Sequence, residues 1–225
     1  MMGDNTTPHS ASSYDAQILN TIPYYDFFHH ETIKLITAAQ VKPRFWLDTG
    51  CGTGTLVQKA AGSFKDTIFI MTDPSPEMIK VAQKKFMTLD HVQFLAPTTT
   101  QDLQLDLKVD VVTAIQAHHY LTKEERKKAT QVCFDILQEN GIYVTFENIR
   151  PSSKKGIQIG KAIWSNYQLS QGKAPESVKE HMKRFDTEFF PITIADHLTL
   201  LKDCGFTTVE LFWYSNMQAG FYATK

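Results

Sequence analysis

Glycine occupies alternate positions directly after a short apolar segment in the first quarter of the chain. The run Phe45-Trp46-Leu47 ends in Asp48, and it is followed by Gly50, Gly52 and Gly54. Glycine permits a sharp turn at a strand end and lets a ligand approach the backbone without meeting a Cβ atom. The first N–H groups of a following helix have no partner inside the helix and point toward such a ligand. The pattern predicts a nucleotide-type site at the carboxyl end of a first β-strand.

The spacing of the glycines distinguishes among kinds of nucleotide site. A dinucleotide fingerprint reads G-x-G-x-x-G and a Walker loop reads G-x-x-x-x-G-K-[ST], whereas this chain reads D-x-G-x-G-x-G. Asp48 suits an ammonium group beside the glycines, and Asp73, after the apolar segment 68–72, suits ribose hydroxyls. An ammonium, a loop open to close approach and a ribose together indicate S-adenosylmethionine. The alternative is a tight β–α turn with two capping acids.

From about Tyr14 to Lys225 the chain resembles the class I S-adenosylmethionine-dependent methyltransferases. The resemblance rests on LDTGCGTG (47–54), TDPSPEM (72–78) and DVVTAIQAHHYL (110–121). It implies an α/β fold: a Rossmann-like, doubly wound, seven-stranded and mostly parallel sheet with helices on both faces. The expected parts are a flexible tail (1–13) and one methyltransferase domain (14–225), which includes an N-terminal helical cap (14–40) and a helical substrate-side insertion before the last helix (150–191).

Site residues are assigned from the same motifs and from their places at strand ends. The expected cofactor contacts are Asp48, Gly50, Cys51, Gly52, Thr53, Gly54, Asp73, Pro74, Ser75, Met78, Thr98, Thr99, Ile115 and Gln116. The expected acceptor contacts are Tyr25, His118, Glu147, Trp164 and Arg184. Methyl transfer depends mainly on proximity and alignment, and it needs a base only when the acceptor must lose a proton. His119 and Tyr25 are the candidates for catalytic roles; packing is the alternative for both, and a buried ion pair is the alternative for Glu147.

One departure from the resembled family concerns the adenine. The family typically carries an acid after the third strand, where this chain has Thr98 and Thr99. The nearest acid is Asp102. Either Asp102 reaches the ring, or backbone groups at the two threonines contact it.

Composition restricts partners and compartment. A net charge of −1 argues against tight, non-specific nucleic-acid binding. Three widely spaced cysteines, Cys51, Cys133 and Cys204, form neither a disulfide framework nor a metal signature. The sequence has no apolar run near 18 residues, and we expect no signal peptide. We expect a cytoplasmic protein with a small-molecule substrate, without membrane contact or bound metal, and leave a homodimer open.

Helical and strand patterns alternate along the chain, as in α/β folds. We expect helices over 25–40, 76–86, 122–140 and 193–204, and strands over 45–48, 68–72, 92–95, 110–116, 142–147, 207–214 and 218–224. Thr122 and Glu125 predict a capping box. The same helix is expected to end at Asn140-Gly141, with the glycine as its left-handed cap. The last two strands are expected to form an antiparallel edge.

The insertion and both ends of the domain leave the function open. Residues 150–184 carry eight Lys or Arg against two Glu, which indicates an anionic substrate or an RNA end, or else a solvated helical cap. Residues 14–25 and 205–216 resemble the carboxy-S-adenosylmethionine synthases of tRNA wobble-uridine modification. Those enzymes transfer a carboxyl group from prephenate, and Arg184 is the candidate to hold it. The glycine loop and Ile115 depart from the synthases and favour a methyltransferase. A non-catalytic partner subunit that retains the fold is a third hypothesis.

Overall fold

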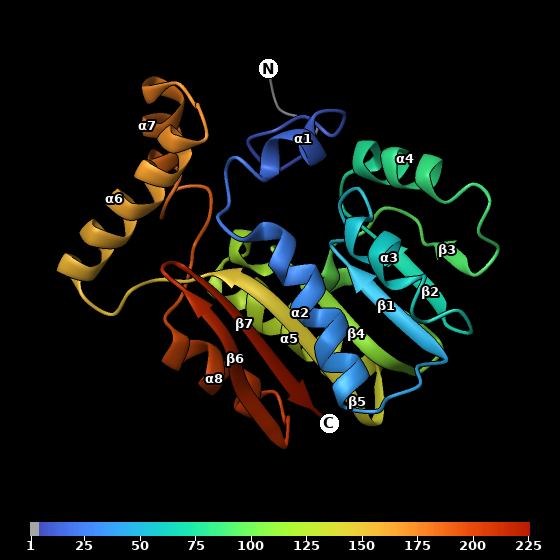
Figure 1. Cartoon of the computed structure of the whole chain (residues 1–225). Coiled ribbons are helices and arrows are strands. Elements are labelled where there is room, and N and C mark those ends of the chain that lie inside the picture. Colours follow the sequence, from blue (N-terminus) through green and yellow to red (C-terminus); the bar gives the residue numbers. More distant parts are fainter. Residues whose placement is uncertain (1–4) are drawn as a thin grey trace.

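A seven-stranded sheet forms the centre of the computed structural model, which describes residues 5–225 (Figure 1). The strands are β1 (Phe45–Thr49), β2 (Ile68–Thr72), β3 (Val92–Phe94), β4 (Val109–Ile115), β5 (Leu137–Asn148), β6 (Thr208–Ser215) and β7 (Gln218–Thr224). The helices are α1 (Tyr14–Ile18), α2 (Tyr25–Ala38), α3 (Thr55–Ala60), α4 (Pro76–Lys85), α5 (Lys123–Ile136), α6 (Lys154–Ser170), α7 (Pro175–Lys183) and α8 (Ile194–Asp203). Two short 3-10 turns are η1 (Thr100–Asp102) and η2 (His118–Tyr120).

The strand order is β3-β2-β1-β4-β5-β7-β6. Strands β1 to β5 pair in parallel, while β7 runs antiparallel between β5 and β6. The predicted α/β class and the antiparallel terminal pair are therefore confirmed. The order of the strands reverses between β1 and β4, and ligands of doubly wound sheets bind beside the carboxyl ends of such a pair.

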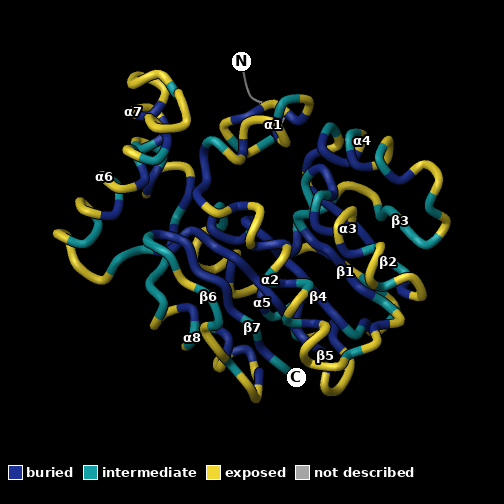
Figure 2. The backbone as a smooth tube through the Cα atoms, in the orientation of Figure 1, coloured by how far each residue is buried: buried dark blue, intermediate teal, exposed yellow. Residues whose placement is uncertain are grey.

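Helices cover both faces of the sheet, so its central strands are buried on both sides (Figure 2). Phe28 of α2, Val57 of α3 and Ala82 of α4 belong to the core on one face. Cys133 of α5 and Leu201 of α8 belong to the core on the other. Strands covered on both faces are apolar at nearly every position, which explains the continuous apolar runs in the sequence. Helices α6 and α7 stand apart from these layers, at the upper left of Figure 1.

Local capping signals placed most helix starts correctly. Thr122 and Glu125 form the predicted capping box, and the Ser75 hydroxyl accepts a hydrogen bond from the Met78 N–H at 3.1 Å. Both interactions satisfy N–H groups that a helix start leaves without partners. The helix after Thr193 and the terminal strands also lie within one or two residues of their expected bounds.

The predicted end of the fifth helix is wrong. Helix α5 stops at Ile136, because Leu137 is extended and already pairs with Val109 of β4. The left-handed residue is Asn140, with φ of 63°. Gly141 serves close packing instead: a Cβ atom there would lie 2.8 Å from the Leu137 Cδ2 atom.

The described part of the N-terminal segment packs against the rest of the molecule. Residues 1–4 of the expected flexible tail lie outside the described residues. His9 Nε2 and Thr21 Oγ1 are 2.7 Å apart, and Ala11 is buried. The Arg184 Nη2 donates to the Thr6 carbonyl at 2.7 Å, so this segment joins the end of α7. Among residues 5–225, no helix has both the length and the apolar character that crossing a bilayer requires.

Candidate active site

A cavity of about 500 Å³ opens at the carboxyl ends of β1, β2 and β4. Its lining includes most of the predicted site residues: Tyr25, Asp48, Gly50, Cys51, Gly52, Thr53, Asp73, Pro74, Ser75, Met78, Thr99, Ile115, Gln116 and His118. Six predicted residues do not line it: Gly54, Thr98, His119, Glu147, Trp164 and Arg184. The volume lies in the range that encloses a small ligand or cofactor.

The glycine loop is shaped by close contacts. Gly50 has φ of 63°, and a Cβ atom there would lie 2.6 Å from the Ala117 Cβ atom. Gly54 has φ of 80°, and a Cβ atom there would lie 2.6 Å from the ring of Phe86. Gly54 therefore lets the loop pack on Phe86, just after α4, which explains why it lies outside the cavity lining although its spacing matched.

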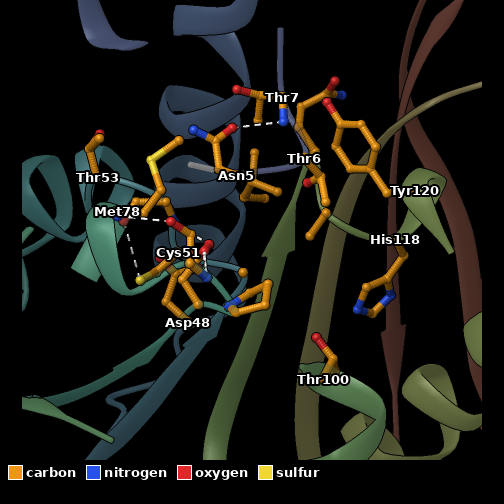
Figure 3. A pocket seen from close by; sticks show the side chains of 18 of the residues that line it. Asn5, Thr6, Thr7, Asp48, Cys51, Thr53, Met78, Thr100, His118 and Tyr120 are labelled. Atoms are coloured by element: carbon orange, nitrogen blue, oxygen red, sulfur yellow. Dashed lines mark hydrogen bonds between the residues drawn. The ribbon is translucent and has the colours of Figure 1, made fainter. Parts of the chain in front are cut away.

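Asp48 places a carboxyl group at the floor of the cavity (Figure 3). It is 2% exposed, and its Oδ1 accepts a hydrogen bond from the Thr113 hydroxyl at 2.6 Å. The Trp46 indole donates to the same hydroxyl at 3.0 Å. Burial raises the pKa of Asp48 to about 7. No cation among the described residues forms an ion pair with Asp48, so a ligand ammonium would supply the missing charge partner.

Asp73 connects the glycine loop to the start of α4. Its Oδ2 accepts from the Gly52 N–H and its Oδ1 from the Ser75 N–H, both at 2.9 Å. Burial raises the pKa of Asp73, while these backbone hydrogen bonds lower it. Each oxygen retains a further lone pair. The carboxylate therefore shapes the loop and can still accept from ligand hydroxyls.

The expected adenine end of the cavity is built from η1. Thr99, Thr100 and Gln101 line it, whereas Thr98 does not. The Asp102 carboxylate is 61% exposed and accepts from Thr99 and Lys128, at 2.7 and 2.9 Å, and Asp102 does not line the cavity. The Gln101 Oε1 is buried and has no hydrogen-bond partner among the described residues. Sequence reasoning missed this amide because it searched for an acid.

The predicted base His119 faces the protein interior. Its ring is 2% exposed, and its Nδ1 lies 2.7 Å from the Glu147 Oε2. Burial acts to raise the pKa of Glu147, but the hydrogen bond from His119 and the electrostatic effect of the neighbouring histidines outweigh it and lower that pKa to about 2. The alternative foreseen for Glu147, a buried ion pair, matches this geometry. Neither side chain reaches the cavity.

Two predicted acceptor contacts hold the roof of the site together. The Trp164 indole donates to the Thr21 carbonyl at 2.7 Å and thereby joins α6 to the α1–α2 turn. The Arg184 Nε donates to the Glu188 Oε2 at 2.7 Å, and its Nη2 contacts Thr6 as described above. Both side chains therefore hold neighbouring segments together and do not line the cavity themselves.

Several lining residues were not predicted. Asn5, Thr6, Thr7, Tyr14, His29 and Tyr120 line the cavity, and Figure 3 shows the N-terminal residues together above it. The hydroxyls of Tyr14 and Tyr25 lie 3.3 Å apart. Tyr14 is the first residue of segment 14–25, which the sequence marked only by its resemblance to the carboxy-S-adenosylmethionine synthases. Nothing local marks the three N-terminal residues, which reach the cavity through tertiary packing.

Helix α1 also fastens the glycine loop. The Asp15 carboxylate accepts from the hydroxyls of Thr53 and Thr55, at 2.5 and 3.2 Å, and from the Lys85 ammonium at 2.6 Å. These hydrogen bonds lower the pKa of Asp15 although burial acts to raise it. Asp15 of α1 and Asp73 therefore both hold the glycine loop.

Comparisons with known proteins agree with the resemblance found in the sequence. A family model described as a methyltransferase domain matches residues 47–143, which contain the glycine loop, Asp73 and η2. These matches confirm the resemblance to the class I S-adenosylmethionine-dependent methyltransferase superfamily that the sequence predicted. Within the described residues, no group of three or more His, Cys, Asp or Glu side chains is arranged to hold a metal ion.

Relatives and solved structures agree with this assignment. A carboxy-S-adenosyl-L-methionine synthase of Nautilia profundicola is 24% identical over 217 residues, covering 96% of this chain and 92% of its own. An uncharacterized methyltransferase of Oceanobacillus iheyensis is 27% identical over 188 residues, covering 81% and 76%.

The structural neighbours share the fold at low identity. A putative O-methyltransferase of Nostoc punctiforme superposes with a TM-score of 0.70 at 14% identity, covering 96% of this chain. This chain spans 58% of that longer protein. The N-methyltransferase NodS of Bradyrhizobium japonicum, in complex with S-adenosyl-L-homocysteine, gives a TM-score of 0.62 at 14% identity, covering 95% and 93%.

Proposed function

We propose that this enzyme transfers a methyl group from S-adenosylmethionine to a small-molecule acceptor. The observation that carries the proposal is the placement of Asp48, the glycine loop and Asp73 around one cavity. Asp48 would pair with the amino group of the cofactor, Asp73 would accept from its ribose, and the Gln101 Oε1 would accept from its adenine amine. When bound, the cofactor supplies an electrophilic methyl group on a sulfonium.

The acceptor end of the cavity is neutral. Thr6, Thr7, Tyr14, Tyr25 and Tyr120 contribute hydroxyls and aromatic surface there. Among the described residues that line the cavity, the acids are Asp48, Asp73 and Glu125, and there is no Lys or Arg. An anionic acceptor would find no cation to pair with, so we propose a neutral acceptor that hydrogen-bonds to hydroxyls. Roofing by the N-terminal segment excludes water and restricts the acceptor's size.

A second candidate function is carboxyl transfer, as in the carboxy-S-adenosylmethionine synthases. The observation in its favour is the match to relatives of that name along nearly the whole chain. However, Arg184, the candidate for the added carboxylate, is engaged by Glu188 and Thr6 and does not line the cavity. The geometry therefore favours methyl transfer.

We also propose a cytoplasmic location. Cys51, Cys133 and Cys204 are all free thiols in the structure. Free thiols persist in a reducing compartment, whereas secreted domains tend to pair them.

A product assay tests the proposed function. Purified protein is incubated with S-adenosylmethionine and a panel of neutral phenols, amines and thiols, and S-adenosylhomocysteine is quantified by mass spectrometry. We expect at least one acceptor to raise product above the acceptor-free rate in the wild type and not in Asp73→Ala. The same spectra, recorded with prephenate present, separate the candidates. A cofactor heavier by one carboxyl group would refute methyl transfer and support the synthase.

A further inference from the structure

The turn η2 is held from its amide side by one buried carboxylate. The Glu147 Oε1 accepts from the His118 N–H at 3.1 Å, and its Oε2 accepts from the His119 N–H at 2.9 Å. The His119 ring Nδ1 lies 2.7 Å from the same Oε2, and the Thr145 hydroxyl donates to Oε1 at 2.8 Å. A buried carboxylate needs such donors, and it orients all of them.

The carbonyl side of the same turn is held by Arg126. Its Nε donates to the His118 carbonyl and its Nη2 to the Leu121 carbonyl, both at 3.1 Å. The same Nη2 also donates to the Phe190 carbonyl. The Phe190 N–H in turn donates to the His119 carbonyl at 2.7 Å. Phe190 lies where the insertion returns to the domain, so the insertion is attached to η2 directly through the Phe190 N–H and indirectly through Arg126.

The turn also forms part of the cavity wall. Tyr120 and Leu121 line the cavity, and Ala117 packs so closely on Gly50 that a side chain at Gly50 would clash with it. The turn therefore lies between the glycine loop on one side and the insertion on the other. A change in its position would alter both at once.

We propose that the His119–Glu147 pair is a positioning pair, which fixes the turn 117–121, whose other four residues line the cavity, and couples the insertion to cofactor binding. The coupling to the cofactor rests on the proposed function. The His119 ring does not contact the ligand: it is buried, it faces Glu147, and it is absent from the cavity lining. Its edge-to-face contact with Phe189, at 6.1 Å between ring centroids, adds a second attachment to the insertion.

Two substitutions at one position separate positioning from direct action on the ligand. In His119→Asn the side-chain amide can still donate toward Glu147, whereas in His119→Phe that donor is lost at similar ring volume. We expect His119→Phe to weaken S-adenosylhomocysteine binding about tenfold or more by calorimetry, and His119→Asn to stay within about threefold of the wild type. Glu147→Gln, which keeps the shape, should behave like His119→Phe and replaces it if that variant does not fold. Glu139→Gln, at an exposed position of β5, is the matched control and should bind as the wild type does.

Amide hydrogen exchange on the free protein provides a second readout. We expect His119→Phe to lose protection both at 117–121 and near Phe190, with the melting curve remaining cooperative. Loss at the turn without loss near Phe190 would refute the coupling. Equal weakening by both His119 variants would refute positioning through the hydrogen bond to Glu147, and wild-type binding in all variants would refute positioning altogether. The exchange measurement needs no cofactor, so it tests the pair even if the wild type fails to bind S-adenosylhomocysteine and the proposed function falls.

Discussion

Asp48 illustrates how the surroundings of one side chain prepare it for a ligand. The carboxyl is buried at the carboxyl end of a parallel strand, and burial raises its pKa to about 7. Thr113 donates its single hydroxyl proton to Asp48, and this hydrogen bond partly opposes the effect of burial. A ligand ammonium would favour the ionised carboxylate. The free site is therefore poised between two protonation states near neutral pH.

The raised pKa of Asp48 predicts that cofactor binding depends on pH. Below pH 7 the carboxyl of the free protein is largely protonated, so binding an ammonium must release that proton. We expect the affinity for S-adenosylhomocysteine to rise roughly tenfold between pH 5.5 and 7.0, because the bound state carries fewer protons. Calorimetry across this range measures the effect. Asp48→Asn should bind weakly and show a flatter profile; a wild-type affinity that does not change with pH would contradict the assignment.

At the scale of elements, α1 holds the glycine loop in place through hydrogen bonds. Its five residues are too few for a stable isolated helix, so it is held by what it packs against. Tyr14 lines the cavity while Asp15 holds Thr53, Thr55 and Lys85. Opening the cavity past α1 requires these contacts to break. The elements that move for ligand exchange are typically such weakly held ones.

We expect Asp15→Ala to speed the dissociation of S-adenosylhomocysteine several-fold. The Asp15 side chain is 45% exposed, so the melting temperature should change little. Stopped-flow displacement measures the rate. The matched control is Asp26→Ala, which removes the exposed Asp26–Lys59 pair between α2 and α3. Equal dissociation rates in Asp15→Ala and the wild type would show that α1 does not limit exchange.

At the scale of the whole molecule, the sequence predicted the features that depend on residues close together in the chain. The glycine loop, Asp48 and Asp73 could be placed because each follows an apolar strand at a recognised spacing. The end of α5 could not, because Leu137 leaves the helix to pair with Val109, a residue far away in the sequence. The direction of His119 depended in the same way on Glu147, which the sequence placed at a strand end without indicating its partners.

Buried histidines predict how the whole molecule responds to acid. Burial lowers the pKa of His118 and His197 to about 4, and that of His29 and His181 to about 3. The unfolded chain binds these protons near pH 6.5 and the folded chain does not, so stability falls as pH drops below 6.5. We expect a loss on the order of 1 kcal/mol per histidine between pH 7 and 5.5. Denaturant unfolding at both pH values measures it, and His197→Asn should show a smaller loss. Equal stability at the two pH values would contradict the burial of neutral histidines.

The measurement that tests the central claim most directly is calorimetric titration of the purified protein with S-adenosylhomocysteine, with Asp73→Ala and Asp102→Ala beside the wild type. We predict one molecule bound per chain. We also predict that Asp73→Ala loses about 1.5–3 kcal/mol of binding free energy, as expected for one charged hydrogen bond. Asp102→Ala should match the wild type, since that carboxylate does not line the cavity and is paired with Lys128. A folded wild-type protein that does not bind, or an Asp73→Ala variant that binds equally well, would contradict the assignment of this cavity to S-adenosylmethionine.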